Sequence, residues 1–591
     1  MKKKLSNFAL FMSSQHFKQL TVYIFIAFIV IISLLSFLNS VNKPFTLDEV
    51  EEARMAEKIN TMGPKTYLPG PNGGGEDLSH PLLYSYTNAI FYRLFGSSEP
   101  ALRGYGMFFY ILSLLILFIL MKETWPNSPK VIQTAVVIGG SLYLINPLLI
   151  QHSMLLNADN NISAFAIMLY LFLFFRYEKL EGADFIRSRM ILGFVVAFNF
   201  MCKEITPCFM LAGVMLYRVV NRQFRKAVID LLLNILLGLI LFWAVWYIYC
   251  KLTGTDILAF IKFTFMRKSK RAVDLGFLMN QLRLFFVIWK WPWYWASAPF
   301  FILVFISAGD RIKTFIRQRH LDRIDFLWIS AIAMFTPFIF IKPSIDMMKY
   351  QYPTYPAFIF LITWFLVEKV LFPKSKSMLS GKKGNILIPV AALFIFVCSI
   401  WYYLLGDYIL LIWSAIERSL IVNYYGPILI TVIAFIVIFR RSQLLKVISI
   451  ALLVLVFPIN AGLNLNQMKD YTTAECWLNY GESGLIETAK HIRDNLIPKY
   501  HVYARKDIQY YLNYRYDMNA ITSHPIYIFR KRTEVADRIF RDNPIQYFVF
   551  DRVTFSYAPN KEITRLLNKY FFVEKKIGSF VIMRHKASVG R

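Results

Sequence analysis

Long apolar stretches recur along this 591-residue chain, and they restrict its possible folds more than any other feature. A helix crosses the hydrocarbon core of a bilayer with about 20 apolar residues, and a spanning segment must satisfy its own backbone hydrogen bonds. The sequence, 57% hydrophobic, therefore predicts a polytopic α-helical membrane protein with about 13 transmembrane helices. The predicted spans lie near residues 21–41, 104–121, 131–150, 161–175, 189–202, 205–220, 228–250, 293–309, 326–342, 351–371, 386–404, 422–439 and 446–463.

The net charge of +29 is spread over short connections between the apolar stretches. Lys and Arg gather in the cytoplasmic loops of membrane proteins, so this charge indicates topology and not a nucleic-acid-binding face. With the N-terminus cytoplasmic, every predicted cytoplasmic connection is basic. Lys2-Lys3-Lys4 precedes the apolar stretch 21–41, which lacks a small-residue cleavage site and is typical of an uncleaved signal anchor. The basic residues of the connections are Lys122, Lys130, Arg176, Lys179, Arg187, Arg189, Arg218, Arg222, Arg225, Lys226, Arg311, Lys313, Arg317, Arg319, Arg323, Lys374, Lys376, Lys382, Lys383, Arg440, Arg441 and Lys446.

One predicted outside connection is also basic, between the seventh and eighth spans. Its cations alternate with Phe260, Phe263, Phe265 and Met266, a composition that suits the membrane interface. Either these cations anchor lipid headgroups or they contact a substrate. They are Lys262, Arg267, Lys268, Lys270 and Arg271.

The hydropathy falls after residue 463, which separates a transmembrane domain, residues 1–463, from a soluble outside domain, residues 464–591. Helical patterns at 485–495, 533–541 and 561–569 alternate with strand patterns at 500–504, 547–550 and 580–583, which indicates an α/β fold. The histidines of this domain are scattered, and we expect them to be surface or structural residues. No cysteine pattern provides a disulfide framework. The domain is expected to cap or recognise rather than catalyse.

A long loop, residues 42–103, follows the first span and should face away from the cytoplasm. Its length and its Gly- and Pro-rich breakers predict a folded lid. The loop begins with the acidic pair Asp48-Glu49 on an expected interfacial helix over residues 48–60. A carboxylate at the membrane edge costs free energy unless it is paired, solvated or used, so the pair is a candidate active site. The alternative is a solvated acidic helix start capped by Thr46.

Further polar residues fall on the same predicted side. Asp159 follows the third span, as a candidate acid or a helix cap. Lys203 interrupts the apolar residues between two spans, where it could hold a phosphate or pair with Glu204. Lys349 and Tyr350 precede the tenth span, where such residues are also common interfacial anchors.

Taken together, these segments resemble the GT-C superfamily of polyprenyl-phosphate-sugar-dependent glycosyltransferases, especially the branch of lipid A aminoarabinose transferases and protein O-mannosyltransferases. The resemblance is in the order and placement of short motifs, and it covers most of the chain. In this sequence the motifs are Asp48-Glu49, His80-Pro81-Leu82-Leu83, Arg103, Asp159, Lys203 and Lys349-Tyr350-Gln351-Tyr352-Pro353-Thr354-Tyr355-Pro356. The chain has Ser79-His80 where aminoarabinose transferases have Glu-Lys, and a single proline after it.

The resemblance implies transfer of one sugar from a polyprenyl phosphate to a hydroxyl group of lipid A, a glycan or a protein, with inversion at the anomeric carbon. Asp48, with Glu49 beside it, would be the base, and Asp159 would orient the acceptor. Asp48, Asp159 and His80 could share a divalent cation. The residues expected to hold the donor phosphate are Arg103, Lys203, Lys349, Tyr350 and His80.

The richness of the chain in Lys, Asn, Ile, Phe and Tyr suggests an AT-rich bacterial genome. We therefore expect undecaprenyl phosphate as the carrier and the bacterial cytoplasmic (inner) membrane as the location. Two other functions fit a polytopic chain, namely a transporter or flippase of lipid-linked sugars and an assembly protein of the cell envelope. A flippase would be expected to show internal repeats and polar sites near the midplane, whereas the polar residues here gather on one side.

Overall fold

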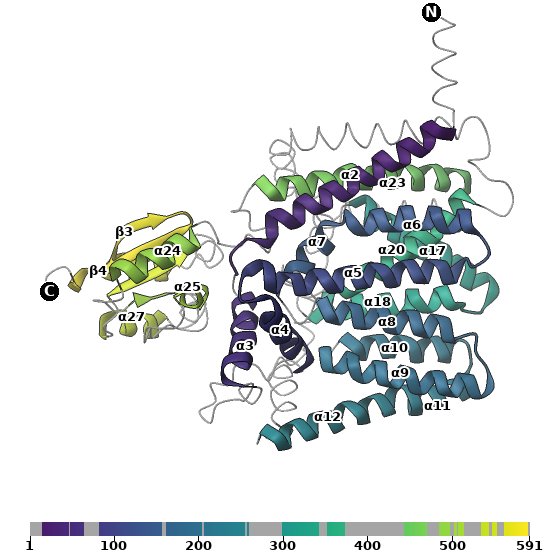
Figure 1. Ribbon diagram of the computed structural model, residues 1–591, viewed down its shortest axis with the longest axis horizontal. Coiled ribbons are helices and arrows are strands. Elements are labelled where there is room, and N and C mark those ends of the chain that lie inside the picture. Colours follow the sequence, from purple (N-terminus) through teal and green to yellow (C-terminus); the bar gives the residue numbers. More distant parts are fainter. Residues whose placement is uncertain are drawn as a thin grey trace, which may run out of the picture.

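Most of the chain forms a bundle of long helices, and a small sheet with its own helices follows at one end (Figure 1). The computed structural model describes residues 15–45, 48–63, 82–156, 161–203, 206–253, 257–258, 298–341, 352–372, 442–469, 484–496, 502–504, 506–512, 533–542, 546–551 and 561–588. The helices of the bundle are α2 (Gln15–Val41), α5 (Glu99–Thr124), α6 (Pro129–Leu144), α7 (Pro147–Met154), α8 (Asn161–Tyr177), α9 (Gly182–Cys202), α10 (Thr206–Val220), α11 (Phe224–Ile229), α12 (Leu237–Thr253), α17 (Ala298–Gln318), α18 (Arg323–Ile341), α20 (Tyr355–Phe365) and α23 (Ser442–Lys469).

Helices lie over the predicted spans, except 386–404 and 422–439, which lie outside the described residues. Within the described part of the chain, six helices are long and apolar enough to cross a membrane, and a bent pair would make a seventh. Two shorter apolar helices, α8 and α10, correspond to predicted spans of similar length. The chain is thus a multi-pass helical membrane protein, as predicted.

The third predicted span, 131–150, is not one straight helix. Helix α6 ends at Leu144, α7 begins at Pro147, and their axes differ by 59°. Proline is favoured at the first position of a helix and disfavoured inside one, and the side chain of Asn146 caps α7 by accepting a hydrogen bond from the Leu149 amide at 3.2 Å. The Asn-Pro pair therefore starts a new helix where hydropathy alone suggested continuity.

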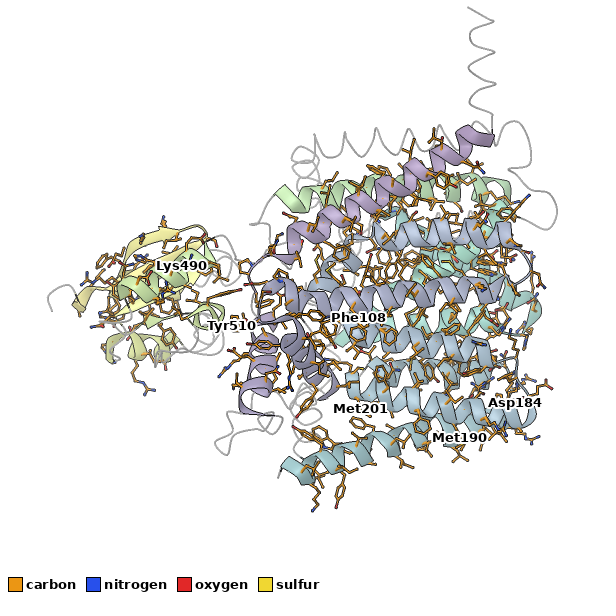
Figure 2. All side chains as sticks on the ribbon, in the orientation of Figure 1. Phe108, Asp184, Met190, Met201, Lys490 and Tyr510 are labelled. Atoms are coloured by element: carbon orange, nitrogen blue, oxygen red, sulfur yellow. The ribbon has the colours of Figure 1, made fainter. Side chains whose placement is uncertain are left out.

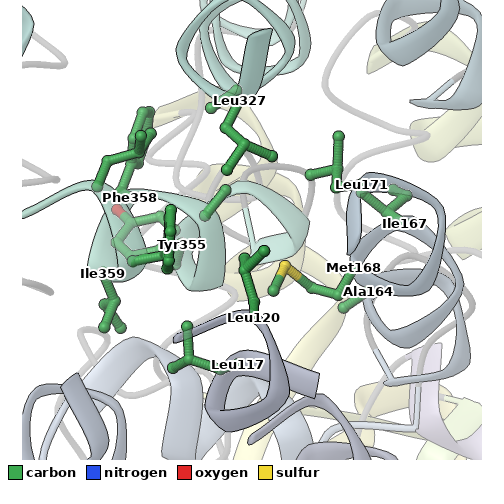
Figure 3. Close-up of a cluster of buried hydrophobic side chains, with 14 of the residues drawn as sticks. Leu117, Leu120, Ala164, Ile167, Met168, Leu171, Leu327, Tyr355, Phe358 and Ile359 are labelled. Atoms are coloured by element: carbon green, nitrogen blue, oxygen red, sulfur yellow. The ribbon is translucent and has the colours of Figure 1, made fainter. Parts of the chain in front are cut away.

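The hydrophobic core extends over most helices of the bundle, and one part of it lies where α5, α8, α18 and α20 meet (Figure 3). Leu120 of α5 lies beside Met168 of α8, and Leu117 of α5, Ile167 of α8 and Tyr355 of α20 belong to the same cluster. The side chains interdigitate because each helix presents an apolar face, and dense packing of this kind provides much of the attraction between helices in lipid.

Two shorter helices, α3 (Asp48–Met62) and α4 (Leu82–Phe95), lie beside the ends of the long helices, between the bundle and the sheet (Figure 1). They come from the long loop 42–103, and α3 extends the interfacial helix predicted at residues 48–60 by two residues. We call this end of the bundle the α3 end. The chain enters α5 and leaves α9 at this end.

The opposite end, which we call the basic end, contains a buried network of two arginines and two carboxylates. Arg218 donates from Nε to Asp230 at 2.7 Å and from Nη2 to Glu178 at 2.6 Å. Arg189 lies 3.2 Å from Glu178 and 3.3 Å from Asp230. The sequence placed Arg189 and Arg218 among the charges of the basic connections, but both side chains are 0% exposed. They hold α9, α10 and the start of the next span together because buried guanidinium groups require carboxylate partners.

The C-terminal domain is a four-stranded sheet in the order β1-β2-β4-β3, with β1 and β2 parallel and the other pairs antiparallel. Side chains alternate between two cores, one against α24 and α25 and the other against α27 and α29. The predicted strands at 500–504, 547–550 and 580–583 overlap β1, β2 and β4, and the predicted helices overlap α24, α27 and α29, whereas β3 and α25 were missed. The elements are α24 (Leu485–His491), β1 (Val502–Tyr503), α25 (Lys506–Tyr511), α27 (Thr533–Asp542), β2 (Tyr547–Asp551), α29 (Lys561–Tyr570), β3 (Phe571–Ile577) and β4 (Phe580–His585).

Candidate active site at the α3 end

The acidic pair Asp48-Glu49 forms the first turn of α3. Thr46, its predicted cap, lies outside the described residues, as does the side chain of Asp48. The side chain of Glu49 is 1% exposed, so this carboxylate is not a solvated charge at a helix start. A buried carboxylate needs a charged partner and hydrogen bonds, and the structure provides both.

The partner of Glu49 is Arg103, in the second turn of α5. The guanidinium donates from Nε to Oε1 at 3.2 Å and from Nη2 to Oε2 at 2.9 Å, and its side chain is 0% exposed. Two parallel hydrogen bonds between ionised groups fix the relative orientation of both side chains. The ion pair therefore fixes the start of α3 against α5.

Arg103 also binds the chain that connects α2 to α3. Its Nη1 donates to the carbonyls of Ser40, at 2.9 Å, and of Lys43, and its Nη2 donates to the carbonyl of Pro44 at 3.1 Å. The guanidinium lies 5.3 Å from the ring centroid of Phe45. All three guanidinium nitrogens thus donate to protein oxygens. These contacts join Arg103 to residues 40–45 and to the first turn of α3, and its contact with the donor phosphate stays a prediction.

Glu49 also contacts the segment that leads to Asp159. The Leu156 amide donates to Glu49 Oε1 at 3.3 Å, and Leu156 is the last described residue before 157–160. On the other side of that gap, Asn161 donates from Nδ2 to the carbonyl of Leu155 at 3.0 Å. The two acidic segments that the sequence placed on one side of the membrane are therefore joined through the Glu49 side chain.

Lys203 ends α9 at the α3 end, where its backbone amide donates to the Asn199 carbonyl at 2.9 Å. The residue is only 3% exposed. Its neighbour Cys202 packs in a cluster with Tyr84 of α4 and Tyr105 of α5, whose rings meet edge to face at 5.5 Å. The structure therefore places Lys203 in the interior, at the end of the bundle that carries Glu49 and Arg103.

The remaining predicted site residues, His80, Asp159, Lys349 and Tyr350, lie outside the described residues. The motif that contains Lys349 resumes at Tyr352, which is buried in a short 3-10 turn that packs against α7 and α8. The ring of Tyr352 lies 6.4 Å from that of His152 in α7. Within the part of the chain that the structure describes, no three His, Cys, Asp or Glu side chains gather as a metal site. The side chains of the predicted metal ligands Asp48, Asp159 and His80 lie outside this described part.

Sequence reasoning missed the contact between the α3 end and the C-terminal domain. The hydroxyl of Tyr511 in α25 accepts a hydrogen bond from the Phe45 amide at 2.5 Å and donates to Glu99 Oε1 at 2.8 Å. Tyr510, whose position at this junction is labelled in Figure 2, packs its ring 6.0 Å from that of Phe45. No local pattern could reveal partners that are 466 positions apart.

Residues 79–304 match the family model of the dolichyl-phosphate-mannose-protein mannosyltransferases. Two solved structures of ArnT from Cupriavidus metallidurans, one in the apo state and one bound to undecaprenyl phosphate, are similar to the whole chain. Each is 15% identical with a TM-score of 0.55, over 96% of this chain and 98% of the ArnT chain. No curated protein sequence matches the chain. The chain therefore has an ArnT-like fold over nearly its whole length, and the match to the mannosyltransferase model supports the resemblance to GT-C glycosyltransferases that its motifs indicated.

Proposed function

We propose that the protein is a membrane glycosyltransferase that transfers one sugar from a polyprenyl phosphate to a hydroxyl acceptor. The match to mannosyltransferases and the ArnT-like fold support this class of reaction. The observation that carries the proposal for this chain is the hydrogen bond from the Leu156 amide to Glu49. It joins the helix that begins with Asp48 to the residue at which the described chain stops before Asp159, which supports the proposal that both acids act in one site.

Asp48 is the proposed base, which would take the proton of the acceptor hydroxyl as that oxygen attacks the anomeric carbon. A positioned carboxylate of this kind contributes about 10²–10⁴-fold to the rate. Glu49, held by Arg103 and Leu156, would position Asp48 rather than touch substrate. Asp159 would orient the acceptor.

The departing phosphate gains negative charge as the glycosidic bond breaks, and fixed cations stabilise that charge. Lys203, which is buried at the α3 end, is proposed to stabilise the phosphate charge. Lys349 and Tyr350, which lie outside the described residues, are proposed to do the same. His80 either contacts the phosphate or joins Asp48 and Asp159 in binding a divalent cation. Carboxylate and imidazole groups are common ligands of divalent cations. Such a cation, when bound, would supply positive charge that neutralises the phosphate.

We infer that the carrier is undecaprenyl phosphate, which is the ligand of one ArnT structure of the same fold. The polyprenyl chain would remain in the bilayer between the long helices while the phosphate reaches the α3 end. The proposal places the α3 end and the C-terminal domain outside the bacterial cytoplasmic membrane and the basic end in the cytoplasm, as the charge distribution predicts. Lipid A, a glycan and a protein are the acceptor classes to be compared.

The experiment is mass spectrometry of envelope lipids, glycans and glycoproteins from cells that lack the protein and from cells that express a variant. In cells that lack the protein, we expect one sugar to be lost from an acceptor and its polyprenyl phosphate donor to accumulate. Expression of the wild type should restore the sugar, and expression of Asp48→Asn should not. Asp184→Asn is the matched control, because Asp184 is exposed at the opposite end of the bundle (Figure 2).

Two outcomes would contradict the proposal. If Asp48→Asn restores the sugar fully, Asp48 is not the base. If no acceptor loses a sugar and a lipid-linked precursor accumulates on the cytoplasmic face, the protein is a flippase. A change in envelope assembly without either effect would indicate the third class, an assembly protein.

A further inference from the structure

The segment of residues 40–45, which ends α2 and begins the connection to α3, is bound from two sides. Arg103 binds it from the bundle through the carbonyls described above. Tyr511 binds it from the C-terminal domain through the Phe45 amide. This connection leads within three residues to the acidic pair. Its position therefore sets where α3 begins and where Asp48 lies.

The Tyr511 hydroxyl forms a chain of two hydrogen bonds with a fixed direction. The Phe45 amide can only donate, so the hydroxyl oxygen accepts from it and its proton is directed to the Glu99 carboxylate. Burial, and then the nearby Glu99 charge, raise the pKa of Tyr511 well above its usual range. The phenol therefore keeps the proton that it donates.

Glu99 and Arg103 lie four residues apart on α5, and so face the same side of this helix. Glu99 is bonded to Tyr511, and Arg103 is bonded to Glu49. One turn of α5 thus connects the C-terminal domain to the acidic pair. The contact is reinforced by an apolar cluster in which Tyr510 packs with Phe45, Val50 and Leu102.

From this arrangement we propose that Tyr511 is a positioning residue for the transferase site. Through the hydrogen bonds of Tyr511 to Phe45 and Glu99, the docked C-terminal domain fixes residues 40–45, and with them the start of α3, in the conformation that turnover requires. The proposal rests on the proposed function, and it gives the C-terminal domain a role in catalysis besides capping or recognition. It concerns the rate of transfer and not the affinity for the lipid carrier.

The test uses Tyr511→Phe in the full chain, which removes the hydroxyl and leaves the ring. Hydrogen exchange of the Phe45 amide should accelerate, because that amide loses its acceptor. The rate at which the missing sugar reappears on its acceptor, per amount of protein, should fall about 3- to 10-fold, the range for loss of one or two hydrogen bonds. Binding of undecaprenyl phosphate to the purified protein should change by less than about twofold, since Tyr511 is not proposed to contact it.

Tyr503→Phe is the matched control. Tyr503 lies in β1 of the same domain, and its hydroxyl is buried without a hydrogen bond among the described residues. Its loss should leave both the Phe45 exchange and the transfer rate unchanged. A second pair of variants acts from α5: Glu99→Gln retains an acceptor for Tyr511 and should behave as wild type, whereas Glu99→Leu should reproduce Tyr511→Phe.

Each outcome discriminates. If Tyr511→Phe accelerates exchange at Phe45 but leaves the transfer rate unchanged, the contact exists but does not position the transferase site, and the inference is overturned. Unchanged exchange overturns it as well. If the Tyr511 variant does not fold, the Glu99 pair decides, because Glu99 lies in the bundle. A wild-type protein that transfers no sugar would refute the proposed function, whereas the exchange measurement would still report whether Tyr511 binds Phe45.

Discussion

The guanidinium of Arg103 meets the carboxylate of Glu49 at two points, and both side chains are buried. The pair joins α5 to the first turn of α3, and its geometry depends on the planar fork of arginine. A lysine at position 103 could supply the charge but not the paired hydrogen bonds or the contacts to the carbonyls of Ser40 and Pro44.

We predict that Glu49→Leu lowers the free energy of unfolding by about 3–5 kcal/mol, because it leaves the Arg103 charge buried without its carboxylate. The double variant Glu49→Leu/Arg103→Met should recover part of this loss, since it removes both charges, but it should not recover sugar transfer. The measurement is unfolding by SDS in mixed micelles, followed by circular dichroism. Additive costs of Glu49→Leu and Arg103→Met in the double variant would show that the pair is not coupled.

The basic end allows a comparison of two arginines with different environments. We predict that Arg218→Met costs about 3–5 kcal/mol, because Glu178 and Asp230 lose one of the two buried cations that they share. Arg187→Met should change stability by less than about 0.5 kcal/mol, since Arg187 is 80% exposed and lies 3.9 Å from an exposed Asp184. The same micelle titration checks both, and a similar cost for the two variants would contradict the assignment of Arg218 to a buried network.

Hydropathy predicted most of the described bundle because the apolar length of a spanning helix follows from the thickness of the bilayer. Apolar length determines where helices cross, and backbone satisfaction requires that they be helices. The same reasoning missed the break at Asn146-Pro147, because local turn chemistry there overrides a continuous apolar run. It also treated Arg189 and Arg218 as topological charges, since a buried cation and an exposed one have the same sequence signature until the partners are known.

In the C-terminal domain, strand patterns predicted β2 and β4, which alternate between two apolar cores. The edge strand β3 was missed because Glu574, Lys575 and Lys576 are solvent-exposed, as charged edge strands commonly are. At the candidate site, motif order brought Asp48, Glu49, Arg103 and Lys203 into consideration. Only the three-dimensional structure shows that Arg103 is bonded to Glu49, because distant pairing depends on how the helices pack.

His491 makes the stability of the C-terminal domain sensitive to pH. Partial burial, and then Lys575 at 3.4 Å from Nδ1, lower the pKa of this imidazole, while Glu574 and Asp494 oppose the shift. Since the folded-state pKa lies below the unfolded value of about 6.5, the unfolded chain binds more protons as the pH falls. This contribution to stability is therefore complete above about pH 6.5 and is lost as the pH falls through the folded pKa.

Calorimetry of the full-length protein from pH 7.5 to pH 5 should show the melting temperature of the C-terminal domain falling with pH. His491→Gln, which cannot titrate, should reduce the slope. An unchanged slope would assign the pH dependence to other groups of the domain.

Two glycines two residues apart on α5 are expected to respond differently to the same substitution. A Cβ at position 106 would lie 1.7 Å from the carbonyl oxygen of Ser153 in α7, whereas a Cβ at position 104 meets nothing within 4 Å. Gly106→Ala should therefore force α5 away from α7, with a loss of about 1–3 kcal/mol or more, as for other overpacked contacts.

Gly104→Ala should be neutral or stabilising by up to about 1 kcal/mol, because alanine has the higher helix propensity. Since α7 leads to Leu156 and hence to Glu49, Gly106→Ala should also lower sugar transfer, whereas Gly104→Ala should not. SDS unfolding and the envelope glycan measurement check both effects. Equal behaviour of the two variants would mean that α5 and α7 are not in the close contact that the structure shows.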